Sequence, residues 1–242
     1  MSIKPKWMAD FKEIIEETRK SIVQIELVEE KTLKYAIIRM FSRAVLSMCE
    51  IYTLLNNGYP KGALALSRQL YEAMVIMAYL VENEGQDEGL VERFFDDIII
   101  SKLQIEIEKR SPEDEENKLI GDFCKKYSNY CNNKGELGDY WWAGKSFTKI
   151  AESVGMPKKY MYKEASKVIH ASSYNALVYI KDKGDVLIGA TYEGIEKPAA
   201  YSLGYFCIAM DLFQNVMQID LANLLEKTRG LAEMIKSLPR FG

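Results

Sequence analysis

The chain has 242 residues, of which 48% are hydrophobic and 28% are charged, and its formal net charge is −3. This length is enough to bury a substantial core, and the composition excludes a disordered chain. The slightly acidic balance argues against a broad nucleic-acid surface, so we expect no DNA partner.

The beginning of the chain lacks the apolar core of a secretory signal, because charged residues follow at Asp10, Lys12 and Glu13. The most apolar stretch, residues 199–210, is shorter than the roughly 20 residues that span a bilayer. The cysteines form no C-x-x-C pair and are typical of free thiols; they are Cys49, Cys124, Cys131 and Cys207. We therefore expect a cytoplasmic protein with no membrane partner.

Apolar residues at three- and four-residue spacing predict helices along nearly the whole chain. The first four are expected at residues 5–30, 32–57, 60–83 and 88–110. Asn57 and Gly58 indicate the end of the second helix, and Pro60 indicates the first turn of the third.

Ser111 and Pro112 indicate the beginning of a fifth helix at residues 112–132, since serine caps helices and proline fits their first turn. A Gly-rich aromatic loop, a short helix and a seventh helix are expected at residues 134–145, 147–154 and 158–180. Residues 181–194 alone have strand character and predict a small hairpin or an irregular loop. A last long helix at residues 197–227, followed by a short helical tail, completes an all-α, single-domain bundle spanning residues 1–242.

The third helix is apolar on nearly every side, which predicts a buried position, yet it carries Arg68, Glu72 and Tyr79 on one face. Arg68 and Glu72 have the spacing of an ion pair within a helix. A charged pair in a buried helix needs partners on other helices, because a lone buried charge is very costly.

Two other helices repeat this pattern. The second carries Arg39 and Arg43 one turn apart, and two like charges on one face favour an anion between them. The seventh aligns Tyr162, Ser166 and His170 by the same spacing. These stripes predict either a satisfied network that joins helices or an anion or nucleotide pocket lined by Arg39, Arg43, Arg68 and His170.

His170 is the only histidine in the chain, and it is a candidate both for a structural role and for a general base near neutral pH. A single histidine leaves no multi-histidine metal site, and Cys124 with Cys131 does not make a zinc site. No Gly-rich phosphate loop or nucleophile elbow is present either. We expect neither a metal nor a cofactor.

The loop around Trp142 gathers aromatic side chains, which fit two interpretations: a stacking platform for a base or sugar, or a lid packed on the bundle. These side chains are Tyr140, Trp141, Trp142 and Phe147.

Several short stretches together resemble a bacterial family catalogued as domain of unknown function 5677. They run from Ser67 to Glu72, Glu92 to Phe95, Trp142 to Ser146, Ile150 to Gly155 and Ser166 to Ser172, within the region from Ala63 to Tyr179. The resemblance implies a helical fold and supplies no activity. The positions that it singles out are Arg68, Glu72, Arg93, Trp142 and His170.

A looser similarity links the chain to HEPN domains, which are helical bundles common in toxins and phage-defence proteins. Their ribonuclease motif places an arginine four to six residues before a histidine on one helix. Here the corresponding positions before His170 are Lys163, Glu164 and Ala165, so the arginine is missing and at best Lys163 replaces it. Lysine lacks the bidentate phosphate grip of arginine.

Two functions from different classes follow. The first is a non-catalytic binding or interaction module, a homodimer in a stress or phage-defence setting, with Arg39, Arg43, Glu72, Tyr79, Arg93, Trp142 and Ser166 as binding candidates for an anionic ligand. The second is a metal-independent ribonuclease of HEPN type, in which His170 is the base and Arg68 or Lys163 steadies the phosphate of RNA. We expect His170 to bond Glu72 or Tyr79 in the first case.

Overall fold

The computed structural model describes residues 4–23, 25, 29–107, 115–156, 160–169 and 190–239. Within these ranges every regular element is helical, which confirms the all-α prediction. The chain divides into two compact units. The first contains residues 1–27, 37–78 and 158–242, and the second contains residues 28–36 and 79–157. The expectation of a single domain stays a prediction.

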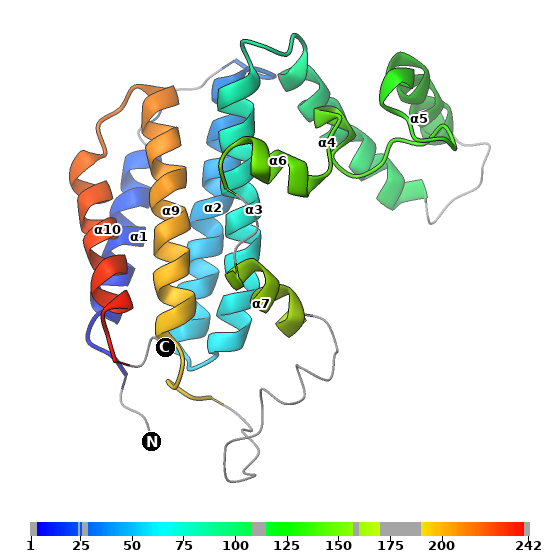
Figure 1. Cartoon of the computed structure of the whole chain (residues 1–242). Coiled ribbons are helices and arrows are strands. Elements are labelled where there is room, and N and C mark those ends of the chain that lie inside the picture. The colour runs from blue at the N-terminus through cyan, green and yellow to red at the C-terminus, as the bar shows by residue number, and fades with distance from the viewer. Residues whose placement is uncertain are drawn as a thin grey trace, which may run out of the picture. The chain divides into compact units, whose positions relative to one another are not determined.

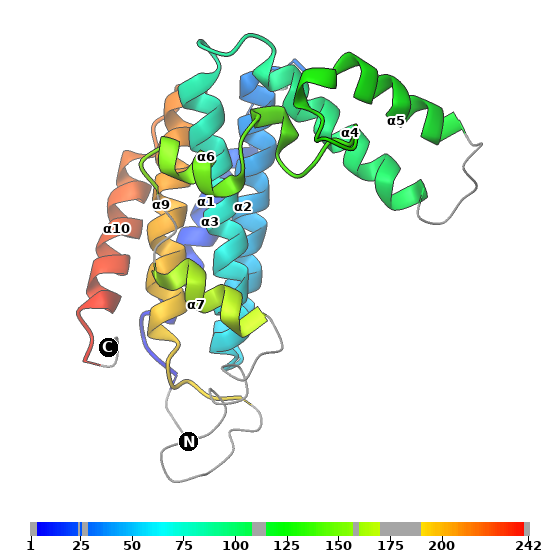
Figure 2. The same ribbon diagram turned by 45° about the vertical axis from the view of Figure 1, so that its right-hand side comes forward.

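The first unit is a bundle of long helices that lie side by side in both ribbon views (Figures 1 and 2). Its members are α1 (Met8–Val23), most of α2 (Leu33–Asn56) and α3 (Pro60–Asn83), α9 (Glu196–Met217) and α10 (Ala222–Lys236), together with the shorter α7 (Tyr160–Ile169). The core is built on stacked aromatic rings, as Phe41 of α2 lies 5.6 Å from Phe206 and 4.0 Å from Phe213 of α9. All three side chains are fully buried.

Helix α3 begins at Pro60 and ends at Asn83, as predicted. By length and composition it is also the one described helix apolar enough to cross a membrane, but 61% of the tested window is buried inside the structure. Leu70 and Val75 are fully buried, as expected of a core helix in a bundle.

The predicted long helix at residues 197–227 is wrong, because the chain ends α9 at Met217 and begins α10 at Ala222. Gln218 adopts the left-handed conformation with φ of 56°, which stops the helix without a glycine. The side chain of Asp220 then accepts a hydrogen bond from the Ala222 backbone N–H at 2.9 Å. The two helices pack along each other, and α10 also packs against α1.

Other boundaries differ by less. Helix α1 ends at Val23, short of the predicted residue 30. The predicted segment 112–132 contains α5 (Glu115–Lys126) and the single turn η1 (Ser128–Tyr130), and the predicted loop contains the turn η2 (Trp141–Ala143). Of the segment predicted as a small hairpin or an irregular loop, residues 190–194 form no strand, and residues 181–189 lie outside the described ranges.

The second unit holds α4 (Leu90–Ile107), α5, both short turns and α6 (Phe147–Ser153). Its polar centre is Asp96 of α4, whose carboxylate is buried and accepts hydrogen bonds from the Tyr127 hydroxyl at 2.5 Å and the Lys126 ammonium at 3.0 Å. Glu92 binds the same ammonium at 2.8 Å. These bonds join α5 to α4, because a buried carboxylate is stable only with donors around it.

The neighbouring Asp97 gives the second unit a pH-dependent stability. Burial raises the pKa of its carboxyl to about 6, against the opposing effect of Trp141 and with a further contribution from Asp139. The folded state therefore binds the proton more tightly than the unfolded chain, so stability rises as pH falls from about 6 towards 4. Above pH 6 the folded protein carries the full cost of the buried charge.

We predict that Asp97→Asn stabilises the protein at pH 7, since the amide removes that cost. The expected gain is about 1–2 kcal/mol after allowance for partial solvent screening. Urea unfolding at pH 7 and pH 5 measures it, and the variant should lose part of the wild-type difference between the two pH values. An equal or larger difference in the variant would contradict this assignment.

Candidate functional site

Glu72 of α3 lies at the centre of the polar network that the sequence predicts. Its Oε1 accepts a hydrogen bond from Nε of Arg68 at 2.9 Å, one turn earlier on the same helix. The same oxygen accepts a bond from the Tyr162 hydroxyl of α7, also at 2.9 Å. The predicted ion pair and its partner on another helix are therefore both present in the first unit.

This network is only partly buried. The side chains of Arg68 and Glu72 are 26% and 24% exposed, so the pair is mostly but not fully buried. The guanidinium carbon of Arg68 lies 4.8 Å from the centre of the Tyr162 ring, within the range of a cation–π contact. Burial lowers the pKa of Arg68, but the hydrogen bond and charge of Glu72 outweigh it and raise the pKa overall. The guanidinium is thus held by a carboxylate and a ring.

Tyrosine rings continue the network across the bundle. Tyr71 of α3 lies 5.4 Å from the Tyr162 ring and 5.1 Å from the ring of Tyr205 on α9. Tyr205 and Tyr201 in turn pack against Leu64 of α3 and Ala165 of α7. Burial raises the pKa of Tyr71 to about 12, so its hydroxyl keeps its proton at physiological pH.

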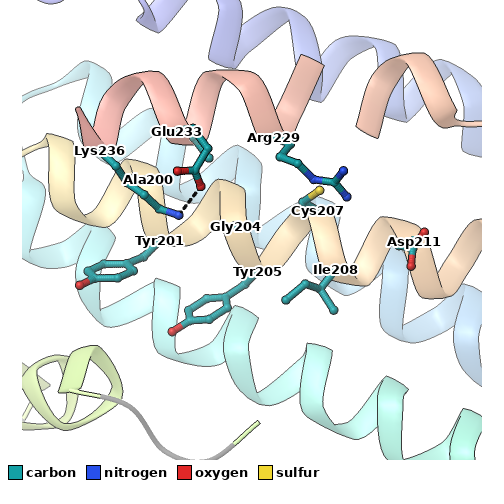
Figure 3. Close-up of a pocket in the computed structure, with 11 residues that line it drawn as sticks. Ala200, Tyr201, Gly204, Tyr205, Cys207, Ile208, Asp211, Arg229, Glu233 and Lys236 are labelled. Atoms are coloured by element: carbon teal, nitrogen blue, oxygen red, sulfur yellow. Dashed lines mark hydrogen bonds and ion pairs between the residues drawn. The ribbon is translucent and has the colours of Figure 1, made fainter. Parts of the chain in front are cut away.

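Behind these tyrosines, α9 and α10 enclose a pocket of about 600 Å³ (Figure 3). Its floor is largely apolar, with Gly204 at the middle and Ile208 38% exposed at one side. Charged residues stand towards both ends: Glu233 and Lys236 near Tyr201 at one end, and Arg229 and Asp211 at the other. Figure 3 shows that Tyr201, Tyr205 and Ile208 project from the same side of α9.

This pocket was missed by the sequence analysis, because a single continuous helix at residues 197–227 cannot fold back on itself. The signal that would have found it is Asp220, a residue that favours a position just before a helix. Once α10 is read as a separate antiparallel helix, its charged residues face the small side chains of α9.

The other predicted residues lie elsewhere. Arg39 and Arg43 are exposed on α2, and Arg43 donates a hydrogen bond to the Gln69 side chain of α3 at 3.1 Å. Ser166 donates its hydroxyl hydrogen to the Tyr162 carbonyl at 2.7 Å, a local bond within α7. Lys163 is exposed. His170 and its expected bond to Glu72 or Tyr79 lie outside the described residues.

Arg93 and Trp142 meet within the second unit, where Nε of Arg93 donates to the Trp142 carbonyl at 3.0 Å. Its other nitrogens donate to the Glu88 carbonyl and to Asp87 at 3.1 and 2.6 Å, and only 6% of Arg93 is exposed. The Trp142 ring is buried against Phe94 and Tyr79. This arrangement favours the interpretation of the aromatic loop as packing.

In the part of the chain that the structure describes, no group of three or more His, Cys, Asp or Glu side chains is placed to hold a metal ion. The polar groups of the network are one arginine, one carboxylate and one phenol. Such groups bind, orient and hold protons, and none of them is an activated nucleophile.

Comparison with known proteins yields one family. The family described as "Family of unknown function (DUF5677)" matches residues 34–187. No curated protein and no solved structure matches the chain.

We predict that the Arg68–Glu72–Tyr162 network stabilises the first unit. Glu72→Ala leaves the Tyr162 hydroxyl and the Arg68 guanidinium without their acceptor, at a cost of about 1–3 kcal/mol. This corresponds to a fall in melting temperature of roughly 2–10 °C for a chain of this size.

Tyr162→Phe is the matched control, because it removes only one hydroxyl and should cost about 1 kcal/mol. A double-mutant cycle with Glu72→Ala, measured by urea unfolding, separates the Glu72–Tyr162 contribution from other effects. Fully additive losses would show that the bond contributes nothing to stability.

Proposed function

The chain belongs to the DUF5677 family, whose function is unknown, and we propose that it is a non-catalytic interaction module that pairs with a second copy of itself. The observation that carries this proposal is the distribution of charge around the pocket between α9 and α10. The earlier expectations of a cytoplasmic location and of a stress or phage-defence setting remain predictions.

The surface between α9 and α10 carries charges of both signs, which alternate along α10 from Arg229 to Glu233 to Lys236. Arg229 and Glu233 lie one turn apart on α10; Glu233 is paired with Lys236 of the same helix at 2.6 Å, and Asp211 of α9 lies on the Arg229 side. When two copies face each other across a two-fold axis at right angles to the helices, each copy's Glu233 comes opposite the other copy's Arg229. Opposite charges meet twice in this arrangement, which favours antiparallel pairing over parallel pairing.

The shape of the same surface also suits a second helix. Ala200, Gly204 and Ile208 follow each other at one-turn spacing along α9, and a Cβ atom added at Gly204 would meet nothing within 4 Å. A small residue at the centre lets another helix approach closely, and the exposed Ile208 supplies apolar area to bury.

The state of Arg68 supports binding over ribonuclease activity. A ribonuclease of HEPN type needs a guanidinium that grips phosphate, whereas Nε of Arg68 is engaged by Glu72 and its planar group lies over Tyr162.

We predict that the protein is a dimer and that Gly204→Arg converts it into a folded monomer. A long charged side chain at the centre of the pairing surface blocks close approach, so the dissociation constant should rise at least about 100-fold. Light scattering coupled to size exclusion measures the mass, which for the wild type should be twice the 27.8 kDa of one chain.

Gly230→Arg is the matched control. Gly230 is likewise in open space on a helix, but it does not line the pocket. This variant should remain dimeric. A specific pair should have formed at a protein concentration of about 100 μM, so a wild type that is still monomeric there would overturn the proposal. Dimers that persist in Gly204→Arg would also overturn it.

A further inference from the structure

Cys124 and Cys131 lie close together in the second unit, although seven residues separate them. Cys124 is in the last turn of α5, and Cys131 follows the turn η1. The Cys131 sulfur lies 3.6 Å from the Cys124 carbonyl oxygen and 3.7 Å from that of Tyr127. The Cys131 thiol therefore lies directly beside the backbone of Cys124 at the end of α5.

The backbone at Cys131 is fixed by bonds on both sides. Its N–H donates to the Ser128 carbonyl at 3.3 Å, and the residue forms an isolated antiparallel bridge with Leu137. The side chain of Asn132 closes the following turn by accepting bonds from the backbone N–H groups of Lys134 and Glu136. The position of the Cys131 thiol is thus set by the fold.

We propose that Cys124 and Cys131 form a reversible disulfide when the protein meets a thiol oxidant of the peroxide class. A disulfide requires Cα atoms about 4.4–6.8 Å apart, and the Cys131 thiol lies against both the carbonyl oxygen and the side chain of Cys124. Both residues are half-buried, so a small oxidant reaches them.

The reaction balances with one peroxide for each pair of thiols. The Cys131 thiolate attacks a peroxide oxygen, which forms a sulfenic acid and releases hydroxide. The Cys124 thiol then attacks the sulfenic sulfur, the sulfur–sulfur bond forms and water leaves. Two thiols are oxidised, hydrogen peroxide is reduced to two molecules of water, and a dithiol reductant reverses the step.

The environment of Cys131 sets the pH dependence of this chemistry. Burial raises the pKa of its thiol, and the neighbouring Cys124 raises it further. At neutral pH only a small fraction of the thiol is ionised. As long as the pH is below the pKa, this thiolate fraction rises about tenfold with each unit increase in pH. Oxidation should therefore be about ten times faster at pH 8 than at pH 7.

The test is oxidation of the intact, folded chain with hydrogen peroxide, followed by thiol counting and a tryptic digest without reductant. The expected product has lost two of its four thiols and contains a disulfide between the peptides 119–125 and 127–134. Dithiothreitol should restore all four. The Cys49→Ser variant should behave as the wild type, and Cys124→Ser and Cys131→Ser should each abolish the linked peptide.

Several results would overturn the proposal. They are four free thiols after oxidation, a link only between separate chains, a link that appears only in urea, or a sulfenic acid that never resolves. Circular dichroism of the serine variants shows whether each is folded, and a labelled-dimedone assay on wild-type protein reads the sulfenic intermediate without any substitution.

Discussion

The first unit depends on one carboxylate that an apolar helix cannot leave unsatisfied. Glu72 lies on α3, and an unpaired, partly buried carboxylate there would cost more than most single contacts contribute. Arg68 supplies a donor from the same helix and Tyr162 supplies one from α7. Only the second bond joins different helices, so the position of α7 on the bundle is tied to Glu72.

The pocket depends on the same constraint through a short series of contacts. Tyr162 contacts Tyr71, which contacts Tyr205, and Ala165 of α7 packs with Tyr201 and Tyr205 against the bundle. These two tyrosines line the pocket between α9 and α10. A substitution that detaches α7 from the bundle therefore also removes the packing of Tyr201 and Tyr205, which line the proposed pairing surface. In this way the polar network is coupled to the proposed self-association.

Much of this arrangement can be predicted from local sequence, and the rest cannot. The beginning of α3 follows from Pro60, and the Arg68–Glu72 pair follows from one-turn spacing. The end of α9 is harder to predict, because Gln218 ends the helix without glycine or proline while the apolar periodicity continues, and Asp220 alone signals a new helix. The contact of Tyr162 with Glu72 joins residues 90 positions apart, and only the fold brings them together.

The central claim is that the surface between α9 and α10 receives a second copy of the chain. A photo-crosslinking residue, benzoylphenylalanine, at Ile208 tests it directly, with the same residue at Met234 as control. The two positions are 38% and 40% exposed, but only Ile208 lines the pocket. The account predicts a covalent dimer after irradiation of the Ile208 protein and far less from the Met234 protein. Covalent dimers in equal yield from both positions, or from neither, would contradict it.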